Sequence, residues 1–203
     1  MAGHSRSLEL TLTPPATPTL VIGPPDWLHE VVDWRGTYRS DEDRMRVVVE
    51  LARQNVLRGG GGPFGAGVFE SAGGGLVAAG VNSVTRLNNS VLHAETLAIM
   101  LAQARLGTYS LGSAGGDSYV LVTSCEPCAM CLGATHWSGV GGLVCGAAKE
   151  DATAAGFDEG PVFAESWAYL ERGGVRVARG VLRDEAAAVI ELYRATGGTI
   201  YNA

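Results

Sequence analysis

Two short stretches of the sequence carry side chains that could hold a metal ion. "TSCEPCAMCLGA" (residues 123–134) contains Cys128 and Cys131, and "HAE" (residues 93–95) lies about thirty residues upstream. A spacing of three puts both sulfurs on one face of the first turn of a helix, whose first position suits Pro127. The unpaired N–H groups and dipole of that helix favour the thiolate, which is the form that binds zinc.

The upstream stretch supplies the rest of the predicted centre. His93 offers a neutral nitrogen as third protein ligand, and three protein ligands leave one position for water, as catalytic zinc requires. Glu95 is then free to move protons. Two residues apart within a helix these side chains would point to nearly opposite sides, so we expect them to flank a helix start. The pattern predicts a zinc–water site with His93, Cys128 and Cys131 as ligands.

Two other metal sites fit part of the same pattern. Cys125, Cys128 and Cys131 read C-x2-C-x2-C, which begins like an iron–sulfur run or could complete a closed Cys3His zinc site. Cys145 is the only other cysteine and lies far from the usual fourth position of a cluster. A closed site gives no role to Glu95. The catalytic site is favoured, and both alternatives stay open.

The composition limits the class of protein. The 203 residues are 46% hydrophobic, enough for one well-buried domain. The net charge is −6 and basic residues do not cluster, which argues against a nucleic-acid partner and favours a small neutral substrate. Four cysteines, three of them in one motif, suit a reducing compartment. No apolar run approaches the length of a membrane span and no signal peptide is evident, so we expect a cytoplasmic protein without membrane contact.

Hydrophobic periodicity predicts a layered α/β domain after an irregular start. Residues 1–39 form a proline-rich, extended leader, and Ser40 is placed to cap a helix that opens residues 40–203. Short apolar runs alternate with helical patterns, so we expect strands at 63–70, 75–82, 118–124, 142–147 and 175–182. Residues 94–106 are helical by composition and Gly107 is placed to end that helix. Ligands in such sheets lie beyond the carboxyl ends of strands.

His-x-Glu followed by Pro-Cys-x-x-Cys is the signature of zinc deaminases of nucleobases. Beyond it, residues 40–203 resemble bacterial guanine deaminases of the cytidine deaminase-like superfamily. The "GFDEG" loop narrows the resemblance to the guanine branch, and the ending "GGTIYN" is similar to a subset that also accepts aminotriazines such as ammeline. The stretches that carry the resemblance are "GGPFGA" (61–66), "GVNSV" (80–84), "HAE" (93–95), "TSCEPCAMCLGA" (123–134) and "AAGFDEGP" (154–161).

The resemblance implies a fold, a cofactor and an assembly. The fold would be a three-layer α/β/α sandwich with a mixed five-stranded sheet, with one Zn²⁺ per subunit. The reaction would be hydrolysis of guanine to xanthine and ammonia, with zinc activating water and Glu95 carrying the protons. The assembly would be a homodimer with exchanged C-terminal segments, in which Tyr201 covers the partner's site. Tyr201 could instead simply pack at the terminus.

The resemblance also implies how the substrate is held. Asn82 ends a strand and carries a donor and an acceptor for the purine edge, although it could simply form a turn. Glu159 would bind ring N–H groups and act as a second proton carrier. Backbone groups near Ala94 would touch the ring. Phe64 and Trp137 match positions where the family encloses the base, and either could instead be a core residue.

Three other functions are compatible with parts of the sequence. A nucleoside deaminase acting on guanosine or cytidine would need room for a ribose, which the sequence does not decide. A tRNA adenosine deaminase would need a basic face, which the charge balance does not provide. A non-catalytic metal-binding module would tolerate loss of Glu95. Metal content and ammonia release separate these functions.

Overall fold

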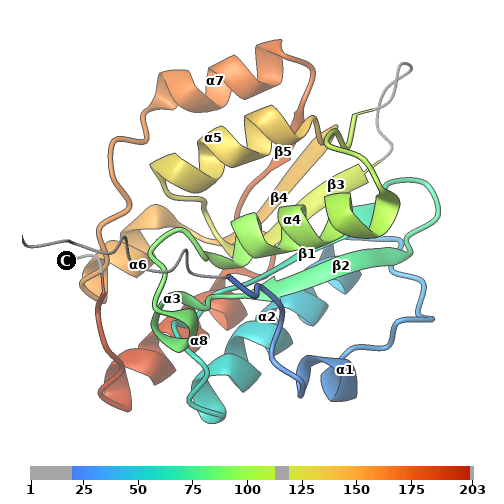
Figure 1. Ribbon diagram of the computed structural model, residues 1–203. Coiled ribbons are helices and arrows are strands. Elements are labelled where there is room, and N and C mark those ends of the chain that lie inside the picture. The colour runs from blue at the N-terminus through green and yellow to red at the C-terminus, as the bar shows by residue number, and fades with distance from the viewer. Residues whose placement is uncertain (1–19, 113–118, 202–203) are drawn as a thin grey trace, which may run out of the picture.

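A five-stranded mixed sheet runs through the middle of the computed structural model, which describes residues 20–112 and 119–201 (Figure 1). The strand order is β2-β1-β3-β4-β5. β1 is antiparallel to β2 and β3, whereas β3, β4 and β5 are parallel. The strands are β1 (Gly65–Glu70), β2 (Leu76–Val81), β3 (Tyr119–Cys125), β4 (Gly142–Ala147) and β5 (Arg176–Ala178).

Helices cover both faces of the sheet (Figure 1). One face carries α2 (Asp41–Leu57) and α8 (Arg183–Ala195). The other carries α4 (Ala94–Leu106), α5 (Ala129–Ser138) and α7 (Ala164–Arg172). The shorter helices are α1 (Leu28–Val31), α3 (Val84–Leu87) and α6 (Lys149–Ala154). The predicted three-layer α/β/α sandwich with a mixed five-stranded sheet is confirmed.

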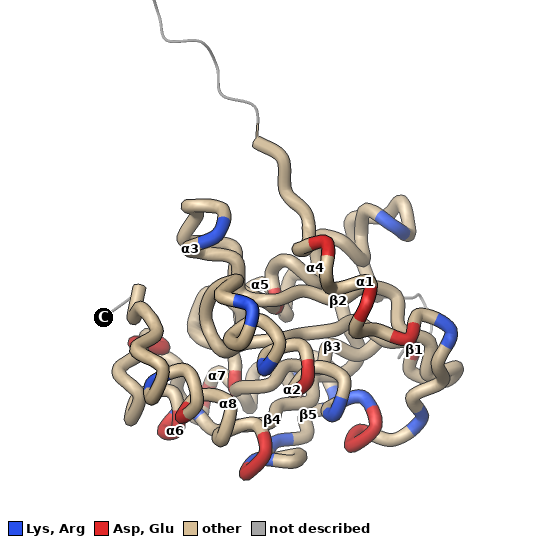
Figure 2. The backbone as a smooth tube through the Cα atoms, turned by 90° about the horizontal axis from the view of Figure 1, so that it is seen from below, with Lys and Arg blue, Asp and Glu red and all other residues tan. Residues whose placement is uncertain are grey.

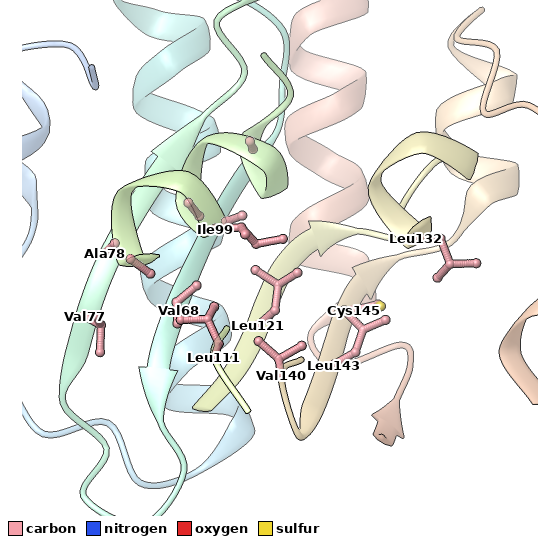
Figure 3. Packing of buried hydrophobic residues seen from close by; sticks show 14 of the residues in the cluster. Val68, Val77, Ala78, Ile99, Leu111, Leu121, Leu132, Val140, Leu143 and Cys145 are labelled. Carbon is pink, nitrogen blue, oxygen red and sulfur yellow. The ribbon is translucent and has the colours of Figure 1, made fainter. Parts of the chain in front are cut away.

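Alternating side chains of the strands separate two cores. On β3, Leu121 packs with residues of α4, α5 and α7, and Figure 3 shows it beside Val68 and Leu143 in that layer. Val120 and Val122 point to the opposite face and pack with residues of α2. Because successive side chains of a strand face opposite sides, one short apolar run serves both layers.

Two helix boundaries follow the expected local chemistry. The Ser40 hydroxyl accepts a hydrogen bond from the Asp43 N–H (3.0 Å), and the Asp43 carboxylate accepts one from the Ser40 N–H (3.4 Å). This reciprocal pair is a capping box, which satisfies N–H groups that the helix leaves free. Gly107 ends α4 with a φ of +65°, a conformation that glycine adopts at little cost. Both boundaries were predicted from the sequence.

The predicted leader is partly packed on the domain. Residues 1–19 lie outside the described residues, but α1 interrupts the expected extended stretch. Leu28 and Val32 are buried in the α2-side core, and the Arg58 guanidinium lies 5.3 Å from the centre of the Trp27 ring. The sequence prediction missed this helix because prolines on its N-terminal side obscured a pattern only one turn long.

Charged residues are dispersed over the described chain. Figure 2 shows blue and red segments interspersed along the tube, and no large basic face appears over the described residues. Several arginines are paired with acidic side chains, among them Arg183 with Asp151 at 2.9 Å. Within residues 20–112 and 119–201, none of the helices has both the length and the apolar character needed to cross a membrane.

Candidate active site

The candidate site lies at one edge of the sheet, where several strands end or begin. β3 and β4 are parallel, so their carboxyl ends meet there and lead into α5 and α6. β2 ends at the same edge because its partner β1, antiparallel to β3, begins there. The sequence prediction of a site beyond the carboxyl ends of strands agrees with this arrangement.

Two helices begin at the predicted metal ligands. His93 is the N-cap of α4 and Cys128 is the N-cap of α5. The expectation that His93 and Glu95 flank a helix start is therefore confirmed. The prediction of Pro127 as the first helical residue is wrong, because α5 begins at Ala129. Cys128 thus stands just before the helix and Cys131 in its first turn, where both sulfurs still face the same point.

The three predicted ligands fit a zinc ion. The ligand atoms of His93, Cys128 and Cys131 all lie within 4.8 Å of one another. Cys128 Sγ and His93 Nδ1 are 3.5 Å apart. A tetrahedral zinc with Zn–S and Zn–N bonds of about 2.3 and about 2.0 Å would separate these two atoms by about 3.5 Å. Among the described residues, no fourth His, Cys, Asp or Glu atom joins this group.

The thiols of the group differ in acidity. A hydrogen bond from the Cys131 thiol, with a further one from His93, lowers the pKa of Cys128 to about 4 although burial opposes the shift. The same hydrogen bond, followed by burial, raises the pKa of Cys131. The protein alone therefore stabilises one thiolate here, and a bound cation would favour the second.

Cys125 does not belong to the metal group. Its Sγ lies 3.7 Å from the carbonyl oxygen of Ala148, and its side chain packs in the cluster formed with α6 and α8. Burial raises the pKa of the Cys125 thiol, which keeps it protonated. These features argue against both the closed Cys3His site and the iron–sulfur run.

Two buried carboxyl groups face the metal group. Glu95 is the second residue of α4 and is 6% exposed, and burial together with the charge of Cys128 raises its pKa. Glu159 lies in the loop between α6 and α7 and is 7% exposed. Burial first, and then Cys128 and Glu95, raise the pKa of Glu159 to about 8. Both groups therefore hold a proton more readily than ordinary carboxylates, as proton carriers require.

Asn82 presents one half of its amide to the site. Its Oδ1 accepts hydrogen bonds from the N–H groups of Gly62 and Val84, both at 3.4 Å. Its Nδ2 is buried and has no partner among the described residues. The donor half is therefore free for an acceptor atom of a ligand.

Aromatic rings enclose the remaining sides of the cavity that the two carboxyl groups and Asn82 line. Phe64 and Phe157 meet edge to face at 5.0 Å, and the Tyr201 ring lies 5.3 Å from Phe157 and 6.3 Å from the His93 ring. All four side chains line one cavity with both carboxyl groups. Its central free space is about 10 Å³, room for about one water molecule. This space is too small for a purine base.

Residues 38–147 match the family described as the cytidine and deoxycytidylate deaminase zinc-binding region. The chain belongs to this deaminase family. Guanine deaminase from Bacillus subtilis (strain 168) is 41% identical over 126 residues, which cover 62% of this chain and 76% of the relative. A tRNA-specific adenosine deaminase from Buchnera aphidicola is 28% identical over 115 residues, 57% of this chain and 70% of the relative.

Solved structures show the same fold at higher coverage. Guanine deaminase from Nitrosomonas europaea has 45% sequence identity and a TM-score of 0.82, covering 87% of this deaminase and 97% of that chain. A structure with bound 2,6-diaminopurine has 46% identity and a TM-score of 0.82, covering 91% and 97%. The similarity therefore extends well beyond the zinc-binding region.

The predicted wall residue Trp137 lies away from the cavity of this deaminase. Its side chain is 81% exposed and contacts the His136 ring at 5.0 Å. Trp137 is nine residues beyond Cys128, which corresponds to about 14 Å along a helix, so its side chain cannot enclose a ligand at the helix start. Within one chain it is neither a cavity wall nor a core residue, and both sequence interpretations are corrected.

Sequence reasoning missed the residue that anchors Asn82. Asn55, on α2, is fully buried, and its Nδ2 donates hydrogen bonds to the carbonyl oxygens of Gly62 and Asn82, both at 2.9 Å. The signal was present, because Asn55 follows Val48 and Ala52 on the apolar face of the helix. A polar residue on a buried face needs a partner inside the fold.

Proposed function

We propose that this deaminase hydrolyses guanine to xanthine and ammonia. The observation that supports this most strongly is the cavity in which two buried carboxyl groups with raised pKa values, Glu95 and Glu159, face the His93, Cys128 and Cys131 group. The similarity to guanine deaminases at 41% and 45% identity agrees with it.

The three ligands would hold one Zn²⁺ per chain. Bound there, zinc supplies Lewis acidity that lowers the pKa of a water molecule toward neutrality. His93 would hold the ion through Nδ1, the ring nitrogen that faces Cys128 Sγ. The N-termini of α4 and α5 both point at the site and compensate the charge of the thiolates.

The two carboxyl groups divide the proton transfers. Glu95 takes a proton from the attacking water and delivers it to the ring nitrogen next to C2 of guanine. Glu159 gives its proton to the departing amino group and takes the proton of the new C2 hydroxyl, so that ammonia leaves as the C2 carbonyl of xanthine forms. A pKa of about 8 for Glu159 means that it holds this proton near neutral pH.

Neutral groups orient the base. The unpaired Nδ2 of Asn82 donates to an acceptor on the purine edge, and the backbone at Ala94 approaches the ring from the start of α4. Phe64 and Phe157 enclose the ring, and Tyr201 closes over it.

The wider proposal includes aminotriazines such as ammeline as further substrates and a homodimer with exchanged tails. The single chain accommodates Tyr201 in its own site, and exchange would place the partner's Tyr201 there instead. All four cysteines are unpaired thiols, which fits a cytoplasmic enzyme of purine catabolism.

The test is a screen for ammonia release by the zinc-loaded protein. Guanine, guanosine, cytosine, cytidine, adenine and ammeline are compared under identical conditions, and metal content is measured on the same sample. We expect release from guanine and one zinc per chain. Glu95→Gln is the control that excludes a contaminating enzyme: it should keep zinc and lose about 10²-fold to 10⁴-fold in kcat. Preference for a nucleoside would contradict the proposal, and no release at all would favour a non-catalytic metal module.

A further inference from the structure

Lys149 is the only lysine among the 15 Lys and Arg residues of the sequence. It is the first residue of α6, directly after β4, and its side chain is half-buried. Its Nζ donates a hydrogen bond of 2.9 Å to the carbonyl oxygen of Gly160. A lysine presents a compact charge on a flexible stem, which suits a single carbonyl better than the wide fork of an arginine.

The accepting carbonyl belongs to the residue that follows Glu159. Gly160 has a φ of +67°, a backbone conformation that residues other than glycine rarely adopt. The chain therefore turns sharply directly after Glu159. The carbonyl oxygen of Glu159 accepts a hydrogen bond of 3.0 Å from the Ala129 N–H at the start of α5. Ala129 and Lys149 thus hold two successive carbonyl groups, those of Glu159 and Gly160, directly after the Glu159 Cα.

A hydrogen bond to Glu126 holds the backbone of Lys149 in place. Its backbone N–H donates to Glu126 Oε2 at 3.2 Å, and Glu126 Oε1 accepts a hydrogen bond of 2.6 Å from Arg179. The Arg179 guanidinium lies 4.6 Å from the centre of the Trp167 ring. Glu126 is the residue between Cys125 and Pro127 in the cysteine motif, so this network joins the metal segment to the Glu159 loop.

We propose that Lys149 is a positioning residue for Glu159, acting through its hydrogen bond to the Gly160 carbonyl. The inference rests on the proposed role of Glu159 in proton transfer. The bond is not needed to satisfy the carbonyl, because the Val162 N–H also donates to it at 2.9 Å. Removing the ammonium therefore loosens the loop without leaving a buried acceptor unpaired.

The test compares Lys149→Met and Lys149→Arg in the zinc-loaded enzyme. Methionine keeps most of the stem and removes the donor and charge, and arginine keeps both. We expect Lys149→Met to lower kcat for guanine on the order of tenfold, with zinc content and Tm close to wild type. Lys149→Arg, which keeps a donor and the charge but fits a single carbonyl less well, should recover part of the rate. Arg183→Met is the matched control. Arg183 also contacts α6, through an exposed ion pair with Asp151, so this substitution should leave kcat unchanged.

A double-mutant cycle with Glu159→Gln separates positioning from general stability. If Lys149 acts through Glu159, Lys149→Met should change kcat less than about twofold in the Glu159→Gln background. Equal losses in both backgrounds, or a wild-type rate for Lys149→Met beside a slow Glu159→Gln, would overturn the inference while leaving the role of Glu159 intact. A wild-type rate for Glu159→Gln would instead remove the proposed role of Glu159, and with it the basis for positioning.

Discussion

At the scale of single residues, burial decides what the acidic groups of the site do. Burial first, and then the nearby charge of Cys128, raises the pKa of both Glu95 and Glu159. Asp158 precedes Glu159 in the same loop, but its side chain is exposed, and its carboxylate accepts a hydrogen bond of 2.8 Å from the Gly160 N–H. Two adjacent acids thus differ in chemistry because only one of them faces the cavity.

The pKa of Glu159 predicts a pH dependence of stability. The folded chain holds this proton up to about pH 8, whereas a carboxyl group in the unfolded chain loses it near pH 4.5. The free energy of unfolding therefore falls as pH rises through this window. We expect Glu159→Gln to be more stable than wild type, by a margin that grows between these pH values and then stays constant. Thermal unfolding of the metal-depleted proteins at several pH values measures the margin, and a margin that shrinks would contradict this account.

Cys125 provides a second prediction at this scale. Because its sulfur packs in the core beside Ala148 and lies outside the metal group, Cys125→Ala should retain zinc and turnover. We expect a loss of about 1 kcal/mol in the free energy of unfolding from the small cavity. Zinc content, ammonia release and chemical denaturation test this together. Loss of zinc would restore the closed Cys3His site as the better interpretation.

At the scale of elements, glycines set the distance between the sheet and its helices. A Cβ on Gly80 would lie 2.5 Å from the carbonyl oxygen of Ala94 and 2.8 Å from the Ala98 nitrogen. A Cβ on Gly65 would lie 2.4 Å from the Val48 carbonyl oxygen on the other face. Both helices therefore approach the sheet more closely than any side chain would allow, and for α4 this approach places the metal ligand.

Gly80→Ala should therefore affect the metal site from a distance. The new methyl group must push the start of α4 outward, and His93 is the N-cap of that helix. We expect a loss of about 1–3 kcal/mol in stability and a weaker affinity for zinc. Competition with a zinc chelator measures the affinity, and Gly65→Ala is the control that crowds α2 instead. Equal zinc affinity in the Gly80→Ala and Gly65→Ala variants would contradict the argument.

At the scale of the whole molecule, segments outside the central α/β layers add to the core and to the site. Residues 28–32 add Leu28 and Val32 to the core, far from the site in sequence. After α8 the chain turns at Gly197, which has a φ of +74°, and returns to place Tyr201 beside His93. The Tyr201 hydroxyl is buried and finds no hydrogen-bond partner within residues 20–112 and 119–201. A ligand or a water molecule in the cavity would supply the missing partner.

Mixed dimers test whether tails are exchanged. Glu95→Gln removes the proton carrier and Tyr201→Ala removes the cover, so each variant alone should be nearly inactive. In an exchanged heterodimer, the intact Tyr201 of the Glu95→Gln chain covers the intact Glu95 of its partner. Co-refolding equal amounts should then restore about a quarter of the wild-type activity, since half the dimers are mixed and each has one complete site. Activity that stays at the level of the single variants would place each tail in its own site.

The sequence by itself determined the chemistry that local spacing controls. His93, Glu95, Cys128 and Cys131 could be assigned because ligand type and helix periodicity act over a few residues. Apolar alternation and capping residues likewise placed the five strands, the start of α2 and the end of α4, whereas β5 is shorter than predicted and α1, α3 and α7 were not predicted.

Only the tertiary structure decided which distant residues complete the site. It excluded Trp137 from the cavity, brought Asn55 to Asn82, and placed Lys149 against the Glu159 loop. These contacts join elements separated by many residues, and their geometry depends on how helices pack on the sheet. No short-range pattern encodes that packing, because it is fixed by the volume and shape of the whole core.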